Sequence, residues 1–451
     1  MNKSVFILLF VKLLVPLFAQ NNDVQTVLSE ITIKLSGRDY TAALALFNDL
    51  PDEEARKTEI LLMRASISNS AGIPSDAKKI ANAVIAKEPE NTGALMILAD
   101  SAMLEGKDRD RRTFLDKVIK IDPNHTRALT DLGNINLGNR ALKTAALYFD
   151  RAIASDPDYG EALVGRAVVY RYNQEPKKSE QLLNRAIINN PGWAHPWHER
   201  SRLYKGAGFI TDALQDIEKA KALEPDNYWI SIDRAMILFE MNRRSEALLE
   251  FDYANSLPGK NFIGYIYSAG LRFDTGDYDA AEKDFARLAK LNPEYYFAYE
   301  GLGMIRMKNK NWASARDAFL DAYKQAPKEY SYALLAAVNW MRAGKLSDPK
   351  QFLAQVLKTA PRDSLDYAML RLFHDLGGDA DVSVKVDKEQ NPLKKSQMLF
   401  YLACYYDIRG NKSLADRYYL MVQELDSTAT IEWRLNEWIL TERGINLRDA
   451  K

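Results

Sequence analysis

The sequence has few of the residues on which covalent and metal-centred chemistry depends. One cysteine, Cys404, is present among 451 residues, so no disulfide can form within the chain. There are four histidines, and there is no Gly-rich phosphate loop ending in Lys-Ser/Thr, no Gly-x-Ser-x-Gly element and no His-Glu-x-x-His motif. We therefore predict that the chain is not an enzyme and has no catalytic residues, no metal and no cofactor.

The sequence also lacks an excess of charge of either sign. Lys plus Arg number 61 and Asp plus Glu number 61, so the formal net charge is zero. Nucleic-acid-binding domains usually carry a basic excess or a basic stripe, because they neutralise phosphates. We therefore predict no nucleic-acid partner.

Long apolar runs are missing except at the N-terminus. A positively charged start, a mostly apolar stretch over residues 4–15 and a small residue at Ala19 predict a signal peptide, residues 1–19, cleaved after Ala19. Lys12 interrupts the run, which is short for a membrane span. We expect export to the periplasm of a bacterial cell envelope and no transmembrane span in the mature chain; an inner-membrane anchor formed by an uncleaved N-terminus is the alternative.

Prolines, in contrast, recur at a nearly constant interval. They are Pro89, Pro123, Pro157, Pro191, Pro225, Pro258, Pro293, Pro327 and Pro361. Successive prolines are 34 residues apart, except for one interval of 33 and one of 35. A fixed period of this length is typical of an array of structural repeats.

Other residue types follow the same period. A small residue comes ten residues after each proline, alanine is frequent at the twenty-second position, and large apolar residues dominate the twenty-sixth. The large apolar residues are Phe149, Leu183, Ile217, Phe251, Phe285, Phe319 and Leu353. Two blocks of helical spacing in each period predict a pair of helices, and the proline separates one pair from the next. One pair cannot bury its apolar face alone, so the pairs must stack.

The repeat resembles the tetratricopeptide repeat (TPR) family. The residues at the family's spacings in one unit are Leu129, Leu132, Gly133, Ala145, Phe149, Ala152 and Pro157. The resemblance covers nearly the whole mature chain and implies an all-α fold, an α-solenoid that winds as a right-handed superhelix. Counting the period in both directions gives about twelve helix-turn-helix repeats over residues 24–429, followed by a C-terminal capping helix over residues 430–445.

The eleventh repeat is irregular near residues 379–395. Val382, Val384 and Val386 alternate there, which is the spacing of a strand. We expect a degenerate second helix, a loop or a short extended segment; a poor but real helix is the alternative.

The predicted capping helix has two different faces. Ile431, Leu435, Trp438 and Ile439 share one face, which we expect to cover the last repeat. The polar residues Glu432, Asn436 and Glu437 are expected on the solvent side.

The first helix of each repeat carries two distinct faces. Core residues are expected 6, 9, 10 and 13 residues after the proline, whereas residues 4, 7, 11 and 14 after it lie about 130° away at 100° per residue. TPR ligands commonly bind on the inner side of the superhelix, so this second face is the predicted groove. Its apolar members from the seventh to the tenth repeat are Trp229, Ile232, Met236, Phe239, Ile263, Ile266, Phe273, Phe297, Met304, Met307 and Met341.

The preceding repeat is polar at the same positions. Arg202 and Lys205 make it basic, and His195 and His198 add two imidazoles three residues apart. Two ligands are too few for a catalytic zinc, and Glu199 points about 100° away from His198. We interpret this segment as a polar part of the groove rather than a metal site.

These features predict a scaffold or adaptor that binds protein or peptide partners in its groove. An extended peptide or amphipathic helix would lie on the apolar stripe, with an acidic end near Arg202 and Lys205. An assembly or secretion chaperone that holds apolar client segments is the alternative function. The stripe could also be core that fills the interior of the superhelix, and the oligomeric state stays open.

Overall fold

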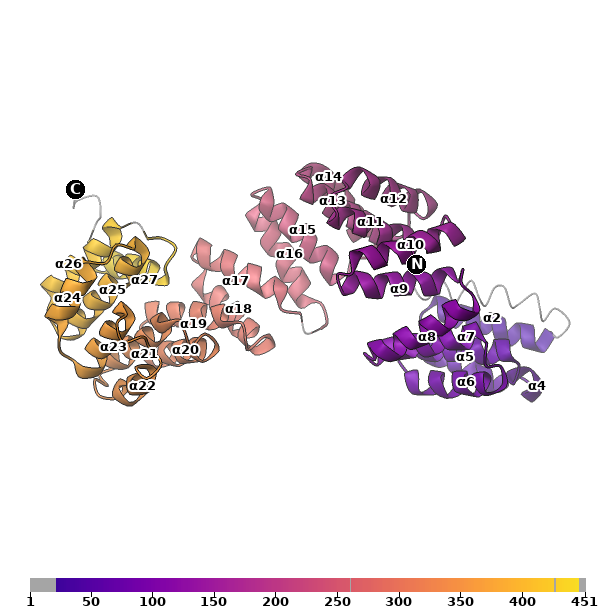
Figure 1. The fold of residues 1–451 in the computed structure, drawn as a ribbon, viewed down its shortest axis with the longest axis horizontal. Helices are drawn as coiled ribbons and strands as arrows, with labels where there is room; N and C mark the ends of the chain where they lie inside the picture. The colour runs from indigo at the N-terminus through magenta and orange to yellow at the C-terminus, as the bar shows by residue number, and fades with distance from the viewer. Residues whose placement is uncertain (1–21, 260, 426, 446–451) are drawn as a thin grey trace. The chain divides into compact units, whose positions relative to one another are not determined.

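The computed structural model describes residues 22–259, 261–425 and 427–445 (Figure 1). These residues contain α-helices, one short 3₁₀ segment and no β-strand, so the predicted all-α fold is confirmed. The predicted signal peptide, residues 1–19, lies outside them. Within the described part of the chain, every helix is too short or too polar to cross a lipid bilayer. The chain divides into two compact units, residues 1–241 and 242–451.

Unit 1 consists of antiparallel helix pairs in chain order. Its first helices are α2 (Asn22–Ser36), α5 (Thr58–Ser70), α7 (Thr92–Leu104), α9 (Thr126–Gly138), α11 (Gly160–Tyr172), α13 (Ala194–Gly206) and α15 (Tyr228–Glu240). The second helices are α3 (Tyr40–Ala45), which continues as the 3₁₀ segment Leu46–Asp49, α6 (Pro74–Lys87), α8 (Asp108–Ile121), α10 (Leu142–Ser155), α12 (Pro176–Asn189) and α14 (Ile210–Leu223). A short helix, α4 (Asp52–Ala55), joins the first two pairs.

Unit 2 continues the alternation and ends with an unpaired helix. It begins with the second helix α16 (Arg244–Ser256). The pairs that follow are α17 (Ile263–Thr275) with α18 (Tyr278–Leu291), α19 (Tyr296–Lys308) with α20 (Trp312–Gln325), α21 (Tyr330–Arg342) with α22 (Pro349–Val356), α23 (Leu365–Asp375) with α24 (Asp379–Asp387), and α25 (Pro392–Ile408) with α26 (Lys412–Glu424). The last helix is α27 (Ile431–Glu442).

The turn inside each pair contains at least one residue with a left-handed backbone, and the turn between α23 and α24 contains two, Leu376 and Gly378. Several of these residues are glycines, at positions 72, 106, 208, 276, 344 and 378, which adopt positive φ at little cost. Others carry a side chain: Arg38, Arg140, Gln174, Asn242 and Lys310, with φ between 57° and 60°. When the glycines and the residues with a side chain in these two sets are taken together in chain order, successive positions are 34 residues apart. The same turn therefore repeats along the chain.

Glycines in the first helices make room for a phenylalanine of the second helix. A Cβ on Gly133 would lie 2.6 Å from the ring of Phe149, and a Cβ on Gly165 of the next repeat would lie 2.4 Å from it. Phe149 is fully buried between these two helices. Gly303 leaves space for Phe319 in the same way. The small residue of the first helix and the large apolar residue of the second helix therefore recur together because they pack against each other.

The irregular eleventh repeat contains a short helix. Residues Asp379–Asp387 form α24, which is 9 residues long, whereas most second helices have 13 or 14. Val382 and Val386, one turn apart, are buried, and Val384 is 52 % exposed. The structure shows the alternative, a poor but real helix, and the extended segment inferred from the valine alternation was wrong. Burial of two valines against the neighbouring helices outweighs the strand preference of the residue type.

Candidate functional site

The first helices keep the predicted core positions. In α9, Leu129, Leu132 and Gly133 are buried, 6, 9 and 10 residues after Pro123. Asn134, at the eleventh position, is exposed. We call the residues 4, 7, 11 and 14 positions after the proline of each repeat the first-helix face.

Three successive first helices of unit 1 border a cavity of about 460 Å³, which we call the N-terminal cavity. Six lining residues occupy the first-helix face of α5, α7 and α9: Leu62, Ser66, Gly93, Met96, Asp100 and Arg127. Met63, Ile97 and Thr126 of the same three helices and the turns that precede α9 and α11 supply the remaining wall. The cavity therefore depends on the stacking of three repeats and on no single helix.

The lining of the N-terminal cavity includes both apolar and charged side chains. Leu62, Met96 and Ile97 provide the apolar surface. Opposite charges lie beside it, because Nη2 of Arg127 donates to both carboxylate oxygens of Asp100, at 2.6 and 2.7 Å. This ion pair joins α7 to α9 and holds both side chains in place.

Two aromatic groups add hydrogen-bonding capacity to the wall. Nδ1 of His125 accepts the backbone N–H of Ala128 at 3.2 Å and so caps α9. Burial lowers the pKa of His125, so the ring is neutral at pH 7 and Nε2 carries the proton. Burial also raises the pKa of Tyr159, so its hydroxyl stays protonated. The wall therefore combines donors with an apolar surface, as peptide and small-ligand sites commonly do.

A second cavity of unit 1, of about 400 Å³, is lined in part by Arg202 of the predicted basic segment, together with Arg171 and Glu199. Arg202 donates to Glu199 at 2.9 Å and also to Asp233, and Arg171 donates to Glu199 at 3.0 Å. Burial by itself would raise the pKa of Glu199, but Arg202 and Arg171 outweigh burial and hold that pKa lowered. These cations are therefore already paired with carboxylates of the same chain.

Lys205 and the two histidines also have partners within the chain. Lys205 forms an ion pair with Glu240 at 2.9 Å. Nε2 of His198 lies 2.6 Å from Oδ2 of Asp233, and the ring of His195 packs edge-on against Trp193 at 5.5 Å. Across the residues that the structure describes, no three His, Cys, Asp or Glu side chains are placed to hold a metal ion.

The predicted apolar stripe is only partly exposed in α15. Trp229 and Phe239 are 49 % and 42 % exposed, Met236 is half-buried, and Ile232 is buried. The two exposed rings are ten residues apart on one helix. They offer separate apolar contacts and not a continuous surface.

In unit 2 the predicted groove residues lie largely beneath other helices. Met304, Met307 and Met341 are buried in the core, and Ile263 and Ile266 are half-buried. Phe273 packs against Trp438 of α27 with ring centroids 5.8 Å apart, and Phe297 is 46 % exposed. These methionines therefore pack inside unit 2 and present little surface to another molecule.

The helix that covers this face is α27, and both of its sides are in contact. Trp438 lies 5.3 Å from Tyr278 as well as against Phe273. Glu432 and Asn436, expected in solvent, are fully buried, and the Tyr401 hydroxyl donates to Glu432 at 2.7 Å. The prediction of a solvent-facing polar side was wrong, because α27 contacts α19 as well as α25 and α26.

The sequence matches the family described as tetratricopeptide repeat over residues 109–160, 130–192 and 269–330. These segments fall in both units, across helices α8 to α12 and α17 to α20. The chain contains tetratricopeptide repeats in both units.

Several solved TPR structures resemble parts of this TPR protein. A tetratricopeptide repeat protein from Parabacteroides merdae is 16 % identical and covers 54 % of this chain and 97 % of its own, with a TM-score of 0.43. PilW, a type IV pilus biogenesis factor, is 17 % identical over 49 % of this chain and 94 % of its own, with a TM-score of 0.38. The MamA protein is 22 % identical and covers 37 % of this chain and 91 % of its own, with a TM-score of 0.31. A comparison with curated protein sequences finds no match.

An apolar stripe alone does not predict the N-terminal cavity. Its first-helix-face residues occupy the fourth, seventh and eleventh positions of the period and include apolar, small and charged types. Leu62 and Met96 at the seventh position, with Asp100 at the eleventh, were the available signal. A count of positions regardless of polarity would have included them.

Proposed function

We propose that this TPR protein is a non-enzymatic scaffold that binds a peptide segment of a partner protein in the N-terminal cavity of unit 1. The observation that carries the proposal is that one cavity is built from the first-helix face of three successive repeats. Its apolar side can take an apolar side chain of the peptide, and the Arg127–Asp100 pair and Tyr159 can contact the peptide backbone.

Unit 1 is favoured over unit 2 because its first-helix face is less enclosed by the chain itself. In unit 2, Phe273 and Met307 lie beside α27, whereas the described residues that border the N-terminal cavity belong to α5, α7, α9 and the turns before α9 and α11. A peptide can therefore enter the N-terminal cavity without displacing an element of the fold.

The test fills the cavity and leaves the fold intact. Ser66, half-buried on its wall, is replaced in the variant Ser66→Trp, and Thr113→Trp on the exposed side of α8 is the matched control. Full-length proteins are used to capture partners from envelope extract with a chemical cross-linker. We expect a few stoichiometric partners with wild type and Thr113→Trp, and their loss with Ser66→Trp. Equal capture by all three proteins would rule out the cavity, and capture of many unfolded clients would favour a chaperone.

We propose further that the protein is exported and acts in the bacterial cell envelope. The support is the composition of residues 1–19, with a charged start, an apolar stretch and Ala19 before the expected cleavage point. Fractionation of producing cells followed by intact-mass analysis tests this. A periplasmic species that begins at Gln20 is expected, and a membrane-bound species that keeps residues 1–19 would favour the uncleaved anchor.

A further inference from the structure

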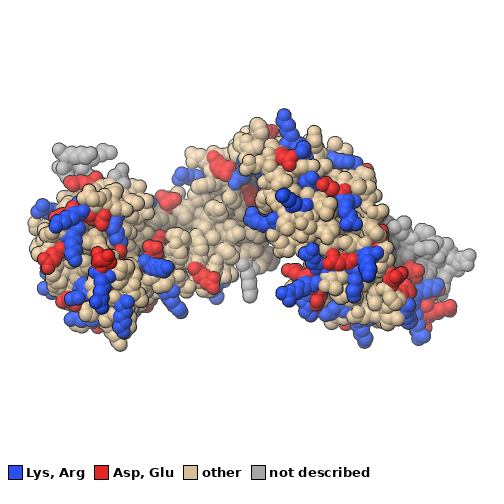
Figure 2. Space-filling model, viewed as in Figure 1, with Lys and Arg blue, Asp and Glu red and all other residues tan. Residues whose placement is uncertain are grey.

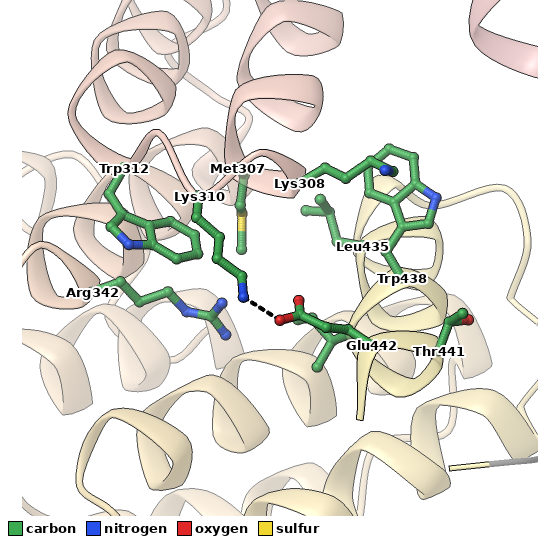
Figure 3. Close-up of a pocket in the computed structure, with 10 residues that line it drawn as sticks. Met307, Lys308, Lys310, Trp312, Arg342, Leu435, Trp438, Thr441 and Glu442 are labelled. Atoms are coloured by element: carbon green, nitrogen blue, oxygen red, sulfur yellow. Dashed lines mark hydrogen bonds and ion pairs between the residues drawn. The ribbon is translucent and has the colours of Figure 1, made fainter. Parts of the chain in front are cut away.

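A cavity of about 350 Å³ lies in unit 2 where α27 meets α19, α20 and α21 (Figure 3). One side comes from Met307, Lys308, Lys310, Trp312 and Arg342. The other side comes from Leu435, Trp438, Ile439, Thr441 and Glu442 of α27. We call it the α27 cavity. It is separate from the N-terminal cavity and shares no residue with it.

The charges in the α27 cavity are unbalanced. Lys308, Lys310 and Arg342 are cationic, and Glu442 is the single acidic side chain among the lining residues that the structure describes. Figure 3 shows Lys310, Arg342 and Glu442 pointing toward the same region, with the Lys310 ammonium bonded to the Glu442 carboxylate. Glu442 is thus a carboxylate that the fold itself places among cations, 132 residues away from Lys310 in the sequence.

Arg342 is held at the side of the cavity by groups outside it. Its Nη2 donates to Asp407 at 3.3 Å and to the Tyr419 hydroxyl at 3.2 Å, and its guanidinium lies 5.2 Å from the ring of Trp312. Its buried Nε has no hydrogen-bond acceptor among the described protein groups. Arg342 is therefore pre-oriented by partners that leave part of its donor capacity unused.

Lys310 occupies the left-handed position of its turn, with φ of 58°. Glycine takes the equivalent position in the neighbouring repeats, at Gly276 and Gly344. A left-handed backbone costs a side-chain-bearing residue free energy that glycine does not lose. The ammonium is thus placed in the cavity at a small cost in stability.

The rest of the lining is apolar and aromatic. Trp312 and Trp438 lie on opposite sides, with Met307 and Leu435 between them (Figure 3). The ammonium of Lys308 lies 5.9 Å from the Trp438 ring centroid. A ligand that fits must combine a compact anion with an apolar body. A bare anion would leave the aromatic rings without contacts, and a neutral apolar molecule would leave the cations without an anionic partner.

We propose that the α27 cavity binds a carboxylate carried on an apolar or aromatic body, and that Glu442 occupies the carboxylate position until the ligand replaces it. Lys310 and Arg342 contact the carboxylate, and Trp312 and Trp438 contact the apolar body. A free organic acid and the carboxyl-terminal residue of a peptide share this chemistry. The proposal does not depend on the function proposed for unit 1.

The primary experiment measures binding to the full-length protein by titration calorimetry. The probe is 3-phenylpropanoate, and 3-phenylpropanamide and acetate are its controls, since they lack the charge and the apolar body. We expect saturable one-to-one binding of the propanoate alone, weakened by added salt. Absence of propanoate binding, or equal binding of the amide, would overturn the proposal.

A second probe, acetyl-Gly-Gly-Phe with a free carboxyl group, distinguishes the two sources of the carboxylate. Tighter binding than 3-phenylpropanoate would identify the ligand as a peptide terminus, and equal or weaker binding would identify it as a free organic acid.

Two pairs of variants identify the groups that bind. Lys310→Gly removes the ammonium and suits the left-handed backbone, so we expect an intact fold and roughly tenfold weaker binding. Gln174→Gly, at the same turn position of another repeat, is the control and should bind as wild type does.

The second pair tests the carboxylate. Glu442→Gln frees the cations and should strengthen binding about two- to fivefold, whereas Glu424→Gln, outside the cavity on α26, should have no effect. Unchanged affinity in both Lys310→Gly and Glu442→Gln would place the probe elsewhere.

Discussion

At the scale of single residues, polar groups inside unit 2 explain features that the repeat pattern leaves open. Glu300 occupies the seventh position of α19, on the first-helix face, and accepts a hydrogen bond from the Tyr332 hydroxyl. Burial raises the pKa of Glu300 to about 7; the Tyr332 hydrogen bond opposes this rise, and the carboxylates of Glu432 and Glu329 add to it. The covered face of unit 2 therefore contains an acid that keeps its proton in weakly acidic solution.

This acid makes the stability of unit 2 depend on pH. The folded state holds the Glu300 proton up to about pH 7, whereas the unfolded state loses it near pH 4.5, so the free energy of unfolding falls as pH rises through this window. We expect Glu300→Gln to remove the fall and, above pH 8, to be more stable than wild type by at most about 3 kcal/mol. Chemical denaturation at pH 5 and pH 8 measures this.

Glu424→Gln provides the control for that measurement, because Glu424 is an exposed carboxylate on α26 and is not among the groups that shift the pKa of Glu300. It should leave the pH dependence of the wild type unchanged. A Glu300→Gln variant with the wild-type slope would show that Glu300 is ionised in the folded protein throughout.

At the scale of helices, the fold rests on the insertion of one second-helix ring between two first helices. Phe149 is buried against Gly133 and Gly165, so truncation leaves a cavity that neither helix can fill. We expect Phe149→Ala to lower the free energy of unfolding by about 3–5 kcal/mol. Phe209→Ala, which removes a ring that is 59 % exposed, should change it by about 0.5 kcal/mol or less. Chemical denaturation of both variants decides the comparison.

The helix pairs were predictable from the sequence because their contacts recur. Gly133 and Phe149 meet in one repeat, Gly303 and Phe319 in another, and each recurrence strengthens the same pattern. The environment of α27 was not predictable in this way. Its contacts with Phe273 and Tyr401 occur once and join residues far apart in the sequence, so no periodicity marks them.

The same distinction applies to the candidate sites. The period correctly separates core positions from the first-helix face, but it does not say which parts of that face are covered. Met307 is buried, whereas Phe239 at the equivalent, fourteenth position of another repeat is exposed. Coverage depends on elements that approach the face from elsewhere, and the sequence has no local signal for such an approach.

At the scale of the whole molecule, both units are arrays in which each repeat mainly contacts its neighbours. Charges are also mixed along the chain: Figure 2 shows Lys and Arg interspersed with Asp and Glu on both units in the face in view. Nearest-neighbour contacts predict that a defect in one repeat spreads over a limited distance. The buried Cys404 of unit 2 can report on this, because burial raises the pKa of its thiol and slows its reaction with a thiol reagent.

We expect the labelling rate of Cys404 to respond to defects according to their position. Phe319→Ala, in unit 2, should speed labelling, and Phe149→Ala, at the same repeat position in unit 1, should leave the rate near that of wild type. Both changes remove the same side chain from a fully buried site. Equal acceleration by the two variants would mean that the array opens as one cooperative molecule.

The position of α27 in the chain also has a consequence for biosynthesis. All the helices that α27 covers precede it, so the ribosome releases Lys310 a full 132 residues before Glu442. At elongation rates of about 5–20 residues per second, the first-helix face of unit 2 is without its covering helix for roughly 7 to 26 s. During that interval Met307, Phe273 and Glu300 are accessible to the surrounding solution. The nascent protein therefore presents a surface that the finished protein no longer has.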